Sequence, residues 1–159
     1  MGRMFPAHFF GIGPTIRLNR RGCNSLCLTD HESSFKIDTK IFIMIVKSSD
    51  KSPYYFEENC YITELLNESN FPGLSIAHVR VLPGEKTELH RLTGLEAYYI
   101  LSGYGEVEID GEMKGTAEPG DVVVISPQST QRVFNHGQED LLFLAICSPR
   151  FEVKNYTGL

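Results

Sequence analysis

The chain of 159 residues has few cysteines, no long hydrophobic run and no excess of positive charge. Its four cysteines are too few and too scattered for a disulfide scaffold, and Cys23-x3-Cys27 lacks the second ligand pair of a zinc finger. The longest apolar run spans only 41–46, whereas a membrane helix needs about 20 residues. A net charge of -5 speaks against a nucleic-acid duplex as partner. We therefore expect neither a membrane nor a nucleic acid to bind this chain.

What the chain does have is an ordinary globular composition, with 42% hydrophobic and 22% charged residues, which excludes wholesale disorder. The charge changes sign along the chain, because 1–43 carry a net +3 and 44–159 a net -8. The first part lacks sustained periodicity and has four arginines and no acid up to Thr29, a composition similar to an organellar transit peptide. We expect a poorly ordered N-terminal extension, either an over-called start before Met44 or a disordered or targeting segment. We expect residues 44–159 to form one domain, and the protein to be cytoplasmic.

From Cys60 onward, short runs rich in β-branched, aromatic and leucine residues alternate with Gly/Pro turns. Asp110-Gly111 predicts a two-residue hairpin turn, because a type I′ turn needs positive φ at both positions. The only helix-compatible stretch is a weak one around 64–69. Strands this short and evenly spaced indicate an all-β sandwich or barrel. The predicted strands are 61–66, 74–82, 97–101, 106–109, 113–117, 122–125, 132–134 and 141–147.

Two segments, 84–103 and 120–135, carry glycines, a histidine and a glutamate at a characteristic spacing. They resemble the two motifs of the cupin superfamily, which implies a double-stranded β-helix or jelly-roll barrel. The chain is also similar to small single-domain (cupin type-2) proteins, often named sugar-phosphate-isomerase-like. The matching residues are Gly84, His90, Glu96 and Gly103 in the first segment, and Gly120, Asp121 and Asn135 in the second.

The resemblance implies a site in the barrel mouth, where a typical cupin binds one divalent metal ion (Zn, Mn, Fe or Ni) through three histidines and a glutamate. Here Leu92 replaces the second histidine and Gln131 replaces the third. His90, Glu96 and Gln131 are thus the candidate ligands, Gln131 a weak one. The residues themselves leave open a metal-free pocket, in which Gln131 donates an amide hydrogen to a buried His90–Glu96 pair.

Side-chain alternation predicts the walls and the outside of this barrel. Candidate pocket residues are Tyr98, Leu92, Ile100 and Val133. Other positions are expected to lie away from it: His78 and Arg80 facing solvent or a partner, His136 exposed in a turn, Arg132 outward, and Cys147 in the core.

Three functions fit these residues. The first is an enzyme in which Glu96 or His90, the candidate catalytic residues, moves a proton next to the carbonyl of a sugar or sugar phosphate. Cationic residues near the motifs are sparse, and Arg91 is the only nearby candidate to bind a phosphate group, which weakens the case for a phosphate substrate. The lost ligands at 92 and 131 count against dioxygenation. The second function is a non-catalytic ligand-binding or sensor cupin, and the third a structural barrel without metal. The expected partners are a small polar molecule and a second copy in a homodimer.

Overall fold

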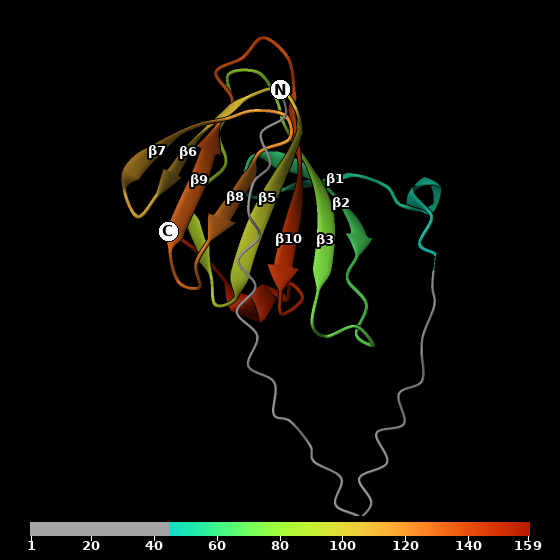
Figure 1. The fold of residues 1–159 in the computed structure, drawn as a ribbon. Coiled ribbons are helices and arrows are strands. Elements are labelled where there is room, and N and C mark those ends of the chain that lie inside the picture. Colours follow the sequence, from blue (N-terminus) through green and yellow to red (C-terminus); the bar gives the residue numbers. More distant parts are fainter. Residues whose placement is uncertain (1–44) are drawn as a thin grey trace, which may run out of the picture. The chain divides into compact units, whose positions relative to one another are not determined.

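A computed structural model describes residues 45–159. Strands dominate this part of the chain and form two antiparallel sheets, which confirms the predicted all-β jelly-roll barrel (Figure 1). The predicted N-terminal extension 1–43 and Met44 lie outside the described residues. No helix in the described part is long and apolar enough to cross a membrane.

The larger sheet has six strands in the order β1-β2-β3-β10-β5-β8, and the smaller has five in the order β11-β4-β9-β6-β7. Two short 3-10 helices, η1 (Ser48–Asp50) and η2 (Val153–Asn155), flank the strands. The strands of the larger sheet are β1 (Tyr54–Phe56), β2 (Cys60–Leu66), β3 (Ser75–Val81), β5 (Leu95–Ser102), β8 (Val122–Ile125) and β10 (Leu141–Ser148). Those of the smaller sheet are β4 (His90–Leu92), β6 (Gly105–Ile109), β7 (Glu112–Ala117), β9 (Thr130–Phe134) and β11 (Tyr156–Gly158).

All eight predicted strands occur, with ends displaced by at most two residues. The predicted hairpin turn is also confirmed, because Asp110 and Gly111 have φ of 53° and 78° between β6 and β7. The weakly helix-compatible stretch around 64–69 forms no helix, because Glu64–Leu66 complete β2, the strand predicted over 61–66, and pair with β3. The sequence did not reveal β1, β4 and β11, which have three residues each. Such short strands give no measurable alternation.

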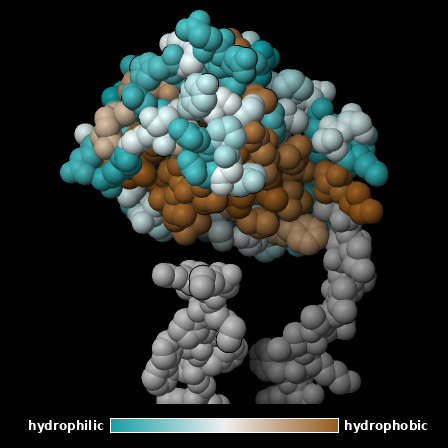
Figure 2. Space-filling model, turned by 45° about the horizontal axis from the view of Figure 1, so that its top comes forward, coloured by the Kyte–Doolittle hydropathy of each residue, from teal (hydrophilic) through white to brown (hydrophobic). Residues whose placement is uncertain are grey.

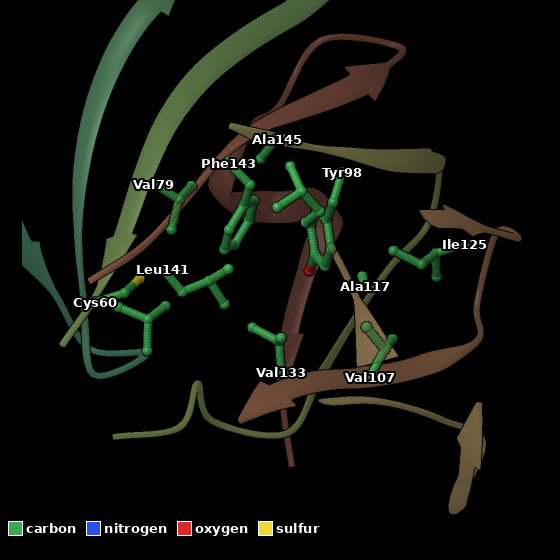
Figure 3. Packing of buried hydrophobic residues seen from close by; sticks show 12 residues of the cluster. Cys60, Val79, Tyr98, Val107, Ala117, Ile125, Val133, Leu141, Phe143 and Ala145 are labelled. Carbon is green, nitrogen blue, oxygen red and sulfur yellow. The ribbon is translucent and has the colours of Figure 1, made fainter. Parts of the chain in front are cut away.

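The core lies between the sheets and is built from the inward positions of the long strands (Figure 3). In β10 every second residue from Leu141 to Cys147 is buried, as the side-chain alternation of a strand requires. Tyr98 and Phe143 come from paired strands, and their ring centroids are 4.5 Å apart. Ile100 and Val133 are each 1% exposed and belong to this core.

Gly103, the last glycine of the first cupin-like segment, lets β5 turn tightly beside the start of β10. Its φ is 75°, and a Cβ at this position would lie 2.6 Å from the carbonyl oxygen of Asp140. Any side chain would therefore clash with backbone as well as strain the turn. This turn fixes the register in which Glu96 lies opposite Cys147.

Candidate functional site

Three strands bring His90, Glu96 and Gln131 together at one end of the barrel. His90 on β4 and Gln131 on β9 are register partners in the smaller sheet, and Glu96 reaches them from β5 of the larger sheet. All three are buried, with exposures of 3%, 6% and 1%. The Gln131 amide nitrogen donates a hydrogen bond to Glu96 Oε2, while His90 Nε2 lies 4.0 Å from the same oxygen. The predicted residues thus form one cluster.

The hydrogen bonding of His90 fixes which ring nitrogen carries the hydrogen. Nδ1 lies 2.9 Å from the carbonyl oxygen of Glu88, and a carbonyl oxygen can only accept. Nδ1 therefore donates, and the lone pair of the neutral ring is on Nε2, which faces Glu96. Burial lowers the pKa of His90, so the neutral ring is the form the fold favours. Because 4.0 Å is too long for a hydrogen bond, Nε2 is left as a free acceptor.

A second carboxyl group, Glu58, approaches His90 from the other side and was not predicted from the sequence. It lies in the turn between β1 and β2, and its Oε1 is 3.7 Å from His90 Nδ1. Tyr156 of β11 hydrogen-bonds the Glu58 carboxyl and stacks on the His90 ring, with centroids 5.3 Å apart. No motif or spacing marks either residue, because Glu58 stands in a turn and Tyr156 near the end of the chain.

Burial shapes the electrostatics of both carboxyl groups. It raises the pKa of Glu96 to about 7, although hydrogen bonds from Gln131 and Cys147 oppose the shift. It raises the pKa of Glu58 to about 8, and the nearby Glu96 adds to that effect. Neither carboxyl has a basic side chain to neutralise it, since the adjacent His90 is neutral. Both groups therefore titrate near neutral pH, where an acid–base catalyst is most effective.

A cavity of about 60 Å³ opens beside these groups. Its walls are mostly aliphatic and aromatic. Of the predicted pocket residues, Tyr98 and Leu92 line it, whereas Ile100 and Val133 lie in the core behind it. His90, Glu96 and Glu58 also line it, together with a ring of side chains from the larger sheet that includes Phe56, Glu64, Val79, Phe143 and Ala145.

The donor set does not fit a tightly held divalent metal. Gln131 donates its amide NH₂ to Glu96, so its amide oxygen points away from that carboxylate. The oxygen therefore does not face the point where a metal ion bound by Glu96 would lie. That oxygen, Oε1, is buried and has no hydrogen-bond partner. Leu92 contributes no donor atom, and no group of three or more His, Cys, Asp or Glu among residues 45–159 has the arrangement of a metal site. Transition metals favour imidazole and carboxylate ligands, and only His90 and Glu96 supply them at this point.

The other histidine and arginine positions lie away from the cavity, as predicted. Arg80 is exposed and pairs with Asp140 at 2.6 Å, and His78 lies on the same outer face of β3. The side chain of His136 is 64% exposed and stacks on Phe134. Arg132 faces away from Gln131 and contacts Glu108. Cys147 is buried, as predicted, but it also lines the cavity, and its thiol is 3.7 Å from Glu96 Oε1.

Comparison with known proteins gives the family. Residues 77–147 match the family described as Cupin domain. An uncharacterized protein of Methanocaldococcus jannaschii, MJ1618, is 34% identical over 116 residues, which are 70% of this chain and 92% of that protein. The chain belongs to the cupin family and is a small single-domain member of it, which confirms the resemblance seen in the motifs.

Solved structures with the same fold include proteins named as enzymes. A predicted oxalate decarboxylase from Thermotoga maritima superposes with a TM-score of 0.60 and 26% identity, covering 67% of this chain and 99% of that one. Pac13, a nucleoside dehydratase from Streptomyces, gives a TM-score of 0.62 at 14% identity, covering 74% and 92%. The Pac13 likeness is one of fold alone.

Proposed function

We propose that the cavity binds a small polar molecule and that Glu96 and His90 transfer a proton on it. The observation that carries this proposal is that His90 Nε2, an acceptor without a donor, and the buried carboxyl group of Glu96 lie 4.0 Å apart in the wall of one cavity. Both line the cavity; His90 Nε2 has no hydrogen-bond donor, and the Glu96 carboxyl is bonded only by the neutral Gln131 amide and Cys147 thiol. Groups of perturbed pKa in an open cavity are typical of acid–base catalysts.

The reaction class that fits is isomerisation through an enol. Ionised Glu96 removes a proton from the carbon next to a carbonyl group, and a protonated neighbour gives a proton to the carbonyl oxygen. For an α-hydroxy ketone or aldehyde, Glu96 then returns its proton to the former carbonyl carbon, while the hydroxyl group on the neighbouring carbon gives its proton back to the group that had donated one. A new carbonyl forms there, and no oxidant or reductant is consumed. Glu58, whose pKa is raised to about 8, holds a proton at neutral pH next to His90 and can supply the cluster with it. The fold neighbours named as enzymes are consistent with a catalytic cavity.

Exchange of carbon-bound hydrogen for deuterium tests this proposal without knowledge of the natural substrate. Three-carbon ketones are incubated with the protein in D₂O, and loss of the proton signal next to the carbonyl is followed by NMR. We expect exchange faster than in buffer alone and at least about tenfold slower in Glu96→Gln, as for loss of a general base. Glu57→Gln, the same change at the exposed neighbour of Glu58, is the control. Exchange no faster than in buffer with every ketone would contradict proton transfer and leave a binding cupin.

We also propose that the protein is a homodimer. Figure 2 shows hydrophobic residues gathered on one side of the domain. On the outer face of the larger sheet, Val122, Tyr99 and Leu144 are register neighbours across β8, β5 and β10. Val122 is 59% exposed and Val124 in the next row 62%, so this apolar face is open to a second copy. Light scattering should give twice the monomer mass, and Val124→Lys should shift it to the monomer. Val153→Lys, on the 77% exposed Val153 of η2, is the control.

A further inference from the structure

The charged residues around the cavity are all of one kind. Three glutamates line it, Glu58, Glu64 and Glu96, and no lysine or arginine of the described chain does so. Glu58 and Glu96 are deep, with side-chain exposures of 13% and 8%, and Glu64 on β2 is half-buried. A negatively charged ligand would lose its hydration and meet three carboxyl groups without one opposing charge. The lining therefore excludes phosphates and carboxylates as ligands.

An arginine that contacts the lining does not alter this balance. Arg150 donates to Asn67, a lining residue, at 3.1 Å. Its guanidinium is also within 3.0 Å of Glu152. The positive charge is thus already paired with a carboxylate outside the cavity lining. Asn67 itself donates to Glu64 at 3.2 Å, so a neutral amide separates Arg150 from that carboxyl group.

The carboxyl groups inside the cavity have only neutral partners. Glu96 accepts from the Gln131 amide and the Cys147 thiol, and Glu58 is bonded by the Tyr156 hydroxyl. Buried carboxylates are normally paired with a cation or a metal, because burying an unpaired charge is costly. His90, 3% exposed, adds an unpartnered ring nitrogen that lines the same cavity. The cavity therefore has carboxyl groups that no basic side chain of its lining pairs with, and a ring nitrogen without a hydrogen-bond donor.

Aromatic rings complete a surface suited to a cation. Tyr54, Phe56 and Phe151 line the cavity with Tyr98 and Phe143. The ring of Phe56 is 6.4 Å from Tyr54 and 5.9 Å from Tyr156, so the rings of β1 and β11 form one cluster next to Glu58. The faces of such rings attract ammonium groups, and the attraction grows when water is excluded. Carboxylates and aromatic faces together favour an organic ammonium ion over a neutral polyol.

We propose that the ligand of this cavity is a small molecule with a primary amino group, whose ammonium is held by Glu58 and Glu64 among the aromatic rings. This inference rests on the proposed small-molecule function and narrows its substrate to amines, which replaces sugar phosphates as the expected class. An ammonium group supplies both the missing charge and the missing donors, since it carries three N–H bonds. The carbonyl end of the same molecule is then left for Glu96 and His90.

Three ketones of equal size test the charge of the ligand: aminoacetone (positive), hydroxyacetone (neutral) and pyruvate (negative). Their affinities are measured by NMR titration of the wild-type protein. We expect aminoacetone to bind about tenfold more tightly than hydroxyacetone, as one charge-assisted hydrogen bond would give, and pyruvate not to bind. Hydroxyacetone binding equally well, pyruvate binding best, or no binding by any of the three would overturn the inference.

Matched variants locate the amino group. Glu58→Gln and Glu64→Gln should each weaken aminoacetone about tenfold while leaving hydroxyacetone unchanged. Glu57→Gln should change neither, because Glu57 is exposed and outside the lining. Glu64 is only half-buried, so its variant tests the site even if Glu58→Gln does not fold. Equal loss for both ketones, or no loss in either variant, would contradict the placement. The exchange of carbon-bound hydrogen in D₂O tests the proposed function separately. If aminoacetone binds but its hydrogen does not exchange, the inferred amine ligand stands and the proposed proton transfer is rejected.

Discussion

Two sets of buried polar residues lie in the same barrel and differ in how completely they are bonded. Asn135, 1% exposed, donates to the carbonyl oxygens of Val81 and Glu139 and accepts from the amide of Gly137. Thr87 accepts from the amide of Val133. In the cluster around His90, by contrast, His90 Nε2 and Gln131 Oε1 lack partners. The first set closes turns of the backbone, and the second leaves a ring nitrogen and an amide oxygen without hydrogen bonds.

Removing Asn135 should have the largest effect on stability. Asn135→Ala removes three hydrogen bonds, one of them buried and two part-buried, which should cost about 4 kcal/mol at about 1–1.5 kcal/mol per bond. Urea unfolding at pH 7 measures this. Glu96→Gln should cost less than about 1 kcal/mol there, because the buried carboxylate is itself unfavourable. If Asn135→Ala and Glu96→Gln lost the same free energy of unfolding, the two sets of buried polar residues would not differ in their contribution to stability.

Stability should fall as the pH rises from 6.5 to 8.5. The pKa values of Glu96 and Glu58 are raised to about 7 and about 8, so the folded state binds these protons more tightly than the unfolded chain, where the pKa is 4.5. Their contribution is complete below the unfolded pKa and is lost as the pH passes the folded values, about 3 kcal/mol over this window. The lowered pKa of His90 acts oppositely and removes stability below the unfolded value of 6.5. Urea midpoints at each pH measure the slope.

Urea midpoints of two variants, measured over the same pH range, show which carboxyl group causes the fall in stability. Glu58→Gln should remove more than half of it, since its pKa of about 8 lies inside the window. Glu57→Gln should leave it unchanged. If the stability of Glu58→Gln fell as steeply with pH as that of the wild type, the Glu58 carboxyl would not be the buried group that loses its proton in this window.

Replacing Thr87 tests the bonded set at a single contact. Thr87→Val keeps the shape but removes the oxygen that accepts from the Val133 amide at 2.9 Å, and should cost about 1–2 kcal/mol. Thr63→Val, on the half-buried Thr63 of β2, is the control and should change stability little. If Thr87→Val left the free energy of unfolding unchanged, the hydrogen bonds of Asn135 and Thr87 would not be what separates these residues from the cluster around His90.

The smallest expected effect concerns Tyr156. Its hydroxyl bonds Glu58 and lowers the pKa of that carboxyl against the effect of burial. Tyr156→Phe should therefore raise the Glu58 pKa, by about half to one unit for one lost hydrogen bond. Carbon-13 NMR of the glutamate carboxyls measures it, and Tyr55→Phe, an exposed tyrosine of β1, is the control. A lowered Glu58 pKa would contradict the assigned bond.

Local patterning made most of the fold predictable. β10 alternates apolar residues at period two, and Asp110-Gly111 can turn a chain almost only as a hairpin. The convergence of His90, Glu96 and Gln131 was also predictable, because the motif spacing carries it. Their roles in catalysis or metal binding stay predictions. Ile100 and Val133 point into the barrel, as predicted, but they lie in the core and do not line the cavity. Side-chain alternation gives the face of the sheet on which a residue lies, and it does not give the residue's position along the barrel.

The sequence by itself determined the strands, the barrel and three residues of the cluster, because side-chain period and turn chemistry act over a few residues. Only the tertiary structure decided that Glu58 and Tyr156 join His90, since closing the barrel joins a turn near its beginning to its last strand. It also decided the charge of the site. The same glutamates in water would be ionised at neutral pH, and burial without a cation leaves them shifted to about 7 and about 8.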